Sequence, residues 1–285
     1  MANGQAWVPQ QGQGAVTLAY QRISNTGHRL DTGVDLTGDS VNMAAYLGID
    51  YATTNRLSFS VGLPYVWGKY LDKEGPPGLP FLSWDKCNCW QSGPQDIGLT
   101  ARYNLILARN GSFALTPSVF GLIPSNKYEF RGESVQGRRL WETGFAVDAG
   151  QRLDVINPNL SVLGHYSYAI VQRVLAIPNN RSNFSLEGRY QLFGGRFTMR
   201  GFTMWQRTHG GLRIPQDLIG ADDETKRQHD RLLRDNSYHA GGGFAYSFPK
   251  VDVFGSYIAY VSGSNTHSGG ALTLGVSWPF EFHRR

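Results

Sequence analysis

Long hydrophobic runs, charged residues and cysteines are all scarce in this sequence. No stretch of about 18 consecutive apolar residues occurs, so no transmembrane helix is expected. Charged residues make up 17% of the 285 residues, against roughly 25% in ordinary soluble proteins. Residues 1–7 lack the basic and apolar regions of a secretory signal peptide, so Met1 is interpreted as a start placed on a mature sequence.

The basic residues do not form a patch. The formal net charge is +5, but Lys and Arg are scattered and interleaved with acids, whereas a nucleic-acid binder concentrates its positive charge. Nucleic acid is therefore not expected as a partner. No cofactor is expected either. The 35 glycines and 14 tyrosines, together with the low charge, instead favour a β-rich protein with many tight turns.

Alternation with a period of two is the dominant pattern. Between residues 57 and 67, large apolar side chains occupy every second position and small or polar ones the positions between. The same pattern recurs in 97–105, 184–192 and 272–282. We predict twelve strands, over residues 14–25, 39–51, 56–70, 95–108, 112–124, 138–152, 158–174, 183–193, 196–208, 237–248, 251–263 and 269–282.

The connections between these strands alternate between short and long. Short links fall near 52–55, 109–111, 153–157, 194–195 and 249–250, and longer ones near 26–38, 71–94, 125–137, 175–182, 209–236 and 264–268. Short periplasmic turns and longer extracellular loops are typical of outer-membrane β-barrels. A soluble sandwich has no reason to sort its loops in this way.

These patterns predict one all-β domain over residues 1–285, a transmembrane up-and-down antiparallel β-barrel of about twelve strands in the bacterial outer membrane. Residues 1–13 would be a periplasmic N-terminal segment. Closing the sheet in lipid pairs every backbone group and turns the apolar face to acyl chains. Segment 273–280 (TLGVSWPF) resembles the C-terminal assembly signal of such barrels, although Glu281–Arg285 follow it. The expected partners are the lipid bilayer, the barrel-assembly machinery during biogenesis and a small-molecule solute.

The face opposite the apolar one is polar and of mixed sign. It is predicted either to line a narrow pore or ligand channel, or to fill a closed barrel with an internal salt-bridge network. Ten side chains are the candidates for this lumen face: Asp50, Asp96, Arg102, Glu142, Asp148, His165, Glu187, Arg189, Arg200 and His239.

His165 and Ser167 form an H-x-S pair on one strand. The pair resembles the arrangement in outer-membrane phospholipases and lipid A deacylases, in which the histidine activates the serine for attack on an acyl ester. In those enzymes the pair faces lipid and a polar residue commonly follows the serine. Here the alternation turns both side chains inward and Tyr168 follows. An acyl hydrolase is therefore the alternative, and no catalytic residue is assigned.

Cys87 and Cys89 lie in the second long loop. They are interpreted as a disulfide or as loop thiols; a soft-metal site with a loop histidine is the less favoured alternative. The most charged loop, 209–236, is predicted to contain a short helix with Asp222 as its N-cap. Loop 71–94 could fold inward as a constriction.

Three segments carry a resemblance to a known family: 13–21 (QGAVTLAYQ), 50–58 with 61–65 (DYATTNRLS and VGLPY), and 275–278 (GVSW). Together they resemble the outer-membrane transporters assigned to the meta-pathway of phenol degradation. The resemblance implies uptake of small, often aromatic or hydrophobic molecules. From it we expect a passive channel, and as a second alternative a barrel with a filled lumen that serves as a scaffold or docking protein.

Overall fold

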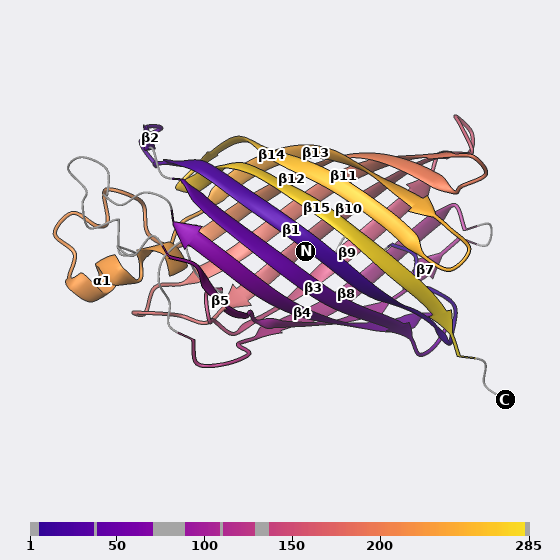
Figure 1. The fold of residues 1–285 in the computed structure, drawn as a ribbon, viewed down its shortest axis with the longest axis horizontal. Helices are drawn as coiled ribbons and strands as arrows, with labels where there is room; N and C mark the ends of the chain where they lie inside the picture. Colours follow the sequence, from indigo (N-terminus) through magenta and orange to yellow (C-terminus); the bar gives the residue numbers. More distant parts are fainter. Residues whose placement is uncertain (1–5, 37–38, 71–88, 109–110, 129–136, 283–285) are drawn as a thin grey trace.

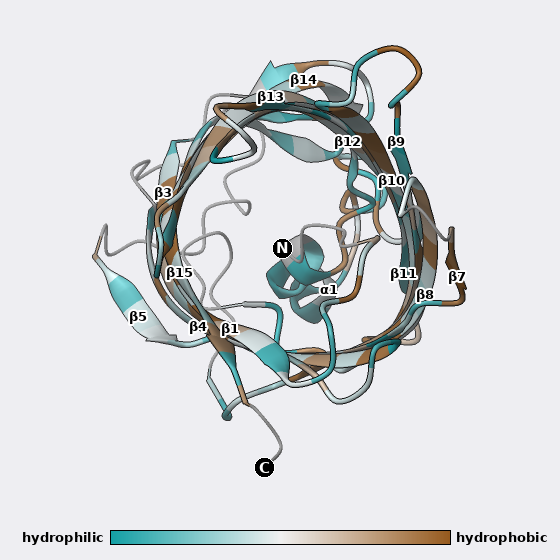
Figure 2. Ribbon diagram, turned by 90° about the vertical axis from the view of Figure 1, so that its right-hand side faces the viewer, coloured by the Kyte–Doolittle hydropathy of each residue, from teal (hydrophilic) through white to brown (hydrophobic). Residues whose placement is uncertain are grey.

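The computed structural model describes residues 6–36, 39–70, 89–108, 111–128 and 137–282, which form one closed antiparallel sheet (Figure 1, Figure 2). Its strands are β1 (Gln13–Arg29), β2 (Asp35–Leu36), β3 (Ser40–Ala52), β4 (Leu57–Tyr70), β5 (Gln91–Pro94), β6 (Ile97–Tyr103), β7 (Ile106–Leu107), β8 (Phe113–Ile123), β9 (Glu142–Arg152), β10 (Leu160–Val171), β11 (Asn179–Leu192), β12 (Phe197–Gly210), β13 (Asn236–Ser247), β14 (Asp252–Ser264) and β15 (Thr266–Glu281). The helix α1 (Asp223–Arg227) and a 3-10 turn (His229–Arg231) lie between β12 and β13.

The ring contains twelve strand positions, as the alternation predicts. β5, β6 and β7 share one of them: β5 and β6 pair with β4, while β6 and β7 pair with β8. The sequence predicts a single strand over 95–108, whereas the structure divides this segment into β6 and β7 at residues 104–105. β5 lies before it, within the predicted loop 71–94. β2 is a short extension that pairs only with the end of β1.

The first and last strands close the barrel. β1 pairs with β15 from Gln13 opposite Glu281 to Arg29 opposite Thr266, with one irregularity between Asn25 and Gly27. This pairing removes the last free sheet edge, so the backbone groups of β1 and β15 find partners within the sheet.

The two faces of the sheet differ as the alternation predicts. Phe145 is 51% exposed, whereas its neighbours Ala146 and Asp148 are each 3% exposed. Apolar side chains on the outer face recur around the ring, among them Leu18, Phe59, Val119, Ile170 and Leu274. Such an outward apolar belt is the surface that a membrane-spanning barrel presents to lipid. No helix in the described part of the chain is long and apolar enough to cross a membrane.

Close packing on the inner face explains one of the glycines. At Gly144 in β9, a Cβ atom would lie 2.2 Å from the carbonyl oxygen of Tyr168 and 2.5 Å from Cζ of Phe120. Only glycine fits at this point, because the Tyr168 carbonyl and the Phe120 ring leave no room for a Cβ atom.

The connections sort by length onto the two ends of the barrel (Figure 1). The end with the short turns also holds the start of β1 and the end of β15, and the other end carries α1. One predicted long link is wrong. Instead of a loop over 264–268, Asn265 alone joins β14 to β15. Asn265 has a positive φ of 49°, and its side chain bonds to neighbouring loops. The hairpin can therefore turn at this single residue.

Candidate functional site

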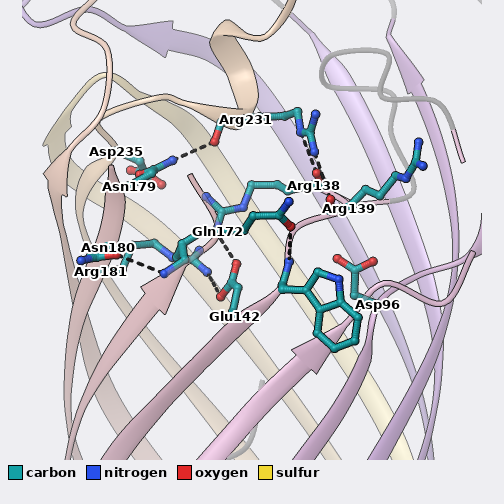
Figure 3. A network of polar contacts seen from close by, with 12 residues as sticks. Asp96, Arg138, Arg139, Glu142, Gln172, Asn179, Asn180, Arg181, Arg231 and Asp235 are labelled. Carbon is teal, nitrogen blue, oxygen red and sulfur yellow. Dashed lines mark hydrogen bonds and ion pairs between the residues drawn. The ribbon is translucent and has the colours of Figure 1, made fainter. Parts of the chain in front are cut away.

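The inner wall over β9–β11 carries a cluster in which one glutamate lies between two arginines. Nη2 of Arg138 donates to Oε1 of Glu142 at 2.5 Å, and Arg181 bonds to the other carboxylate oxygen (Figure 3). Arg181 reaches across β10 at the small, buried Ala169, which is its direct cross-strand neighbour. Burial and the neighbouring Arg181 together lower the pKa of Arg138 to about 10, while Glu142 opposes the shift. We call Arg138, Glu142 and Arg181 the loop-end triad.

A second cluster of the same composition lies deeper, on β11 and β12. Glu187 bonds to Nε of Arg189, and Nη1 of Arg200 lies 3.7 Å from its other oxygen. Arg189 and Arg200 are directly opposite each other in the sheet, a like-charge pair that would be unfavourable without the glutamate. The guanidinium carbon of Arg200 lies 5.5 Å from the ring centroid of Phe202, within cation–π range. We call Glu187, Arg189 and Arg200 the mid-barrel triad.

A third ionic cluster lies on another part of the ring, formed by β3, β4 and β6. Ser60 donates its hydroxyl proton to Asp50 and accepts a bond from Arg102. Nη1 of Arg102 lies 3.6 Å from Oδ1 of Asp50. In this cluster the acid is more exposed than the arginine: the Asp50 side chain is 32% exposed and that of Arg102 only 6%.

His165 and Ser167 bond to different partners. Nδ1 of His165 lies 2.8 Å from Oδ1 of Asp148 on β9, and Ser167 accepts a hydrogen bond from Asn183 at 3.4 Å. The bonds found in the described part of the chain therefore orient the histidine toward an acid without joining it to the serine.

The structure groups the ten predicted residues in part. It brings together Asp50 with Arg102, Asp148 with His165, and Glu187 with Arg189 and Arg200; the other three have separate partners. Glu142 belongs to the loop-end triad, Asp96 accepts a hydrogen bond from Tyr128 at 2.8 Å, and His239 packs edge-on against Tyr260. Burial and the bond to Asp96 raise the pKa of the Tyr128 hydroxyl above its ordinary value.

The segment before β1 contacts the inner wall at the end with the short turns. The carbonyl oxygen of Ala6 accepts bonds from Thr116 at 2.6 Å and Asn104 at 3.3 Å, and Nε1 of Trp7 donates to the carbonyl oxygen of Gly111. Ala6 is fully buried and packs with Ala114 and Leu163. This segment therefore occupies space inside that end of the barrel.

Residues 211–235 form a folded cap beyond the other end. Leu212, Ile214, Leu218, Leu232 and Leu233 pack with Leu30 in a small hydrophobic core. In a view along the barrel axis, α1 lies within the outline of the ring (Figure 2). Asp222 is the N-cap of α1 and accepts from the backbone N–H of Thr225, as predicted.

Hydrogen bonds tie this cap to the barrel wall. Arg231 donates to the carbonyl oxygens of Arg138 and Arg139, and Asn179 donates to the carbonyl oxygen of Arg231 (Figure 3). Because Arg138 belongs to the loop-end triad, the bond from Arg231 to its carbonyl oxygen links the cap directly to the triad.

The cysteine loop is described only in part. Cys89 is disulfide-bonded and accepts a bond from Gln91. Cys87, the chain's other cysteine, and most of the predicted constriction loop 71–94 lie outside the described residues. Among the residues that are described, no group of three or more His, Cys, Asp or Glu side chains could hold a metal ion.

Sequence reasoning missed Arg138 and Arg181 as members of an ionic cluster, and Ala6 and Trp7 as contacts of the inner wall. Arg181 falls in the predicted loop 175–182, whereas β11 begins at Asn179. If the predicted strand 183–193 is extended by two residues at its start, the alternation places Arg181 on the same face as Glu187.

Comparisons with known proteins support the fold and leave the family open. No protein-family model matches the sequence, and no curated protein sequence matches it. Among solved structures, the chain is similar to the COG4313 outer membrane channel from Pseudomonas putida F1, with a TM-score of 0.76 and 14% sequence identity over 98% of this chain and 100% of that one. The chain therefore shares the fold of an outer-membrane β-barrel.

Two further solved structures have the same fold at lower similarity. The NanC porin gives a TM-score of 0.55 at 11% identity over 92% of this chain and 98% of that one. The β domain of the Bordetella autotransporter BrkA also gives 0.55, at 12% identity over 93% and 99%. A porin and an autotransporter domain are thus equally similar, so this likeness does not by itself decide the function.

Proposed function

We propose that the protein is an outer-membrane channel through which small molecules diffuse passively. The observation that carries this proposal is the exposure of charged groups on the inner wall: the side chains of Asp50 and Arg189 are 32% and 29% exposed. Charged groups in a dry, filled barrel would be fully buried and paired. Partial exposure indicates water-accessible space beside them.

The two ends of the barrel would set which molecules pass. At the end with the short turns, which we place in the periplasm, the segment at Ala6 and Trp7 narrows the opening. At the other end the cap over 211–235 lies in the path of an entering solute. Selectivity then follows from wall charges and from these two obstructions.

The fold shared with the COG4313 outer membrane channel supports the channel function. The sequence resemblance to the transporters of the meta-pathway of phenol degradation supports small aromatic or hydrophobic molecules as the cargo. We also infer that β15, whose residues 273–280 resemble the assembly signal, is recognised by the barrel-assembly machinery during biogenesis.

Single-channel recording of the refolded protein in a planar bilayer tests the proposal. Discrete, steady conductance steps are expected, and addition of small aromatic solutes should block them. Silence from protein shown to be folded and inserted would contradict it. That result would favour the second candidate, a scaffold barrel, for which the contacts of Ala6 and of the cap provide the filling.

We further infer that the protein is not an acyl hydrolase at His165. The bonds of His165 and Ser167 run to Asp148 and Asn183. Cleavage of a short-chain ester by the wild type that disappears in Ser167→Ala would contradict this inference. Equal background activity in both proteins is the expected result.

A further inference from the structure

In each triad the most exposed side chain is that of an arginine. In the loop-end triad the Arg138 and Arg181 side chains are 25% and 21% exposed, and that of Glu142 only 5%. In the mid-barrel triad the Arg189 side chain is 29% exposed, whereas Glu187 and Arg200 are 14% and 12% exposed. The groups of the triads that are most exposed to a solute inside the barrel are therefore the guanidinium groups of Arg138, Arg181 and Arg189.

The charge balance of each triad points the same way. Glu142 bonds to two arginines through its two oxygens, and Glu187 likewise faces Arg189 and Arg200. Each triad thus keeps one positive charge that its own carboxylate does not neutralise. Nε of Arg181 and Nε of Arg200 are buried without a hydrogen-bond partner in the described part of the chain, so the glutamates do not satisfy all the guanidinium donors.

The cluster on β3, β4 and β6 provides an internal contrast. There the acid is the exposed partner, because Asp50 is 32% exposed and Arg102 6%. One arginine faces one carboxylate, and the pair carries no excess positive charge. The excess positive charge is therefore specific to the wall over β9–β12 and is not found in every ionic cluster of the barrel.

We propose that the loop-end and mid-barrel triads are two successive binding stations for a monoanionic solute, which makes the channel selective for small carboxylates that carry an apolar or aromatic body. This inference rests on the proposed channel function and names its substrate class. Arg181 and Glu187 are six positions apart on β11, which separates the stations by roughly 20 Å along the strand.

The chemistry of the stations suits such a ligand. Guanidinium groups bind carboxylates through paired, charge-assisted hydrogen bonds, and they do so more strongly away from bulk water. At the mid-barrel station Phe202 lies beside Arg200, so an aromatic ring could pack there while its carboxylate meets Arg189 or Arg200. Two weak stations in series let a solute leave as readily as it enters.

The first experiment measures the reversal potential of the refolded protein in a salt gradient. We expect anions to be preferred by up to about tenfold, the lower end of the range over which a charged cleft concentrates its counter-ion. The double variant Arg181→Met with Arg189→Met removes the excess charge from both triads and should abolish most of this preference. Arg207→Met, which removes one positive charge from an exposed position on β12 outside the triads, is the control and should keep the preference.

A variant in the opposite direction separates selectivity from a merely structural role. Glu187→Gln keeps the shape of the side chain but leaves the mid-barrel triad with a second positive charge, so the anion preference should rise. If both Glu187→Gln and the arginine variants simply lower it, the triads are structural and the inference fails. A conducting wild type that prefers cations, or neither sign, also overturns it while leaving the channel function standing.

Binding is measured independently of conductance, with benzoate as the probe and benzyl alcohol and benzylammonium as neutral and cationic controls. Saturation-transfer NMR on folded protein in detergent should detect benzoate with the wild type and with Arg207→Met, and lose most of the signal with the double arginine variant. If the protein proves non-conducting yet binds benzoate in this pattern, the stations are supported and the channel function fails. Equal signals for the three probes would overturn the stations.

Discussion

The indole ring of Trp7 lies directly on Gly150: a Cβ atom at residue 150 would fall 2.5 Å from Cη2 of Trp7. Gly150 belongs to β9 and is not in a left-handed backbone conformation. A larger residue is therefore excluded by the ring and not by the backbone.

Gly150→Val should displace the N-terminal segment from the inner wall. The new methyl groups would overlap both Trp7 and Ala6, whose Cβ would lie 2.7 Å away, while valine itself suits a strand. We expect a larger single-channel conductance, because the opening at this end widens. Gly164→Val is the control, since no atom lies within 4 Å of a Cβ there. Equal conductance in both variants would show that the segment does not limit flow.

An arginine on the outer apolar belt should destabilise the inserted barrel. Val119 is 62% exposed on the outer face of β8, and Val119→Arg would cost up to about 2–4 kcal/mol at the bilayer midplane. The control is Val155→Arg, which makes the same substitution outside the belt, at a fully exposed residue in the turn between β9 and β10. Urea titration in liposomes should show a clear shift of the unfolding midpoint for Val119→Arg and little shift for Val155→Arg. The reverse order would mean that the belt does not face lipid.

The cap should depend on its own small core. Leu232 is fully buried there, and Leu232→Ala should lower the local free energy of unfolding by about 2–5 kcal/mol. We expect faster proteolysis of residues 211–235 while the barrel itself stays intact. Ile219→Ala changes a residue of the same cap that is 72% exposed and should leave the cleavage rate unchanged. A resistant cap in Leu232→Ala would mean that the bonds from Arg231 and Asn179 suffice to hold it.

Asp50 and Arg102 should depend on each other through Ser60. Arg102→Met leaves Asp50 and the Ser60 hydroxyl without their cationic partner, and the loss should amount to about 1–3 kcal/mol of unfolding free energy, moderated because Asp50 keeps contact with water. Asp50→Asn combined with Arg102→Met should cost less than the sum of the single variants. A double-mutant cycle from urea unfolding measures this difference, and strict additivity would rule out a coupled cluster.

The sequence predicts the strand faces and the helix cap but not the contacts between distant strands. Alternation depends on neighbouring residues alone. The N-cap at Asp222 involves only residues up to Thr225, three positions later in the chain. The bonds from Glu142 to Arg181 depend on the register of β9, β10 and β11 together, which no local pattern encodes. Residues 6–12 have no periodicity, so the contacts of Ala6 and Trp7 could not be anticipated.

The pairing of β1 with β15 also constrains how the molecule can be made. The two strands that seal the ring are the first and the last to be synthesised, so this contact has nearly the greatest sequence separation that the chain allows, and forming it carries a large loop-closure entropy. Without β15 the remaining strands can form only a sheet with two open edges. Completion of the chain is thus the event that permits the ring to close, and a product truncated before β15 would remain an open sheet that proteases can recognise.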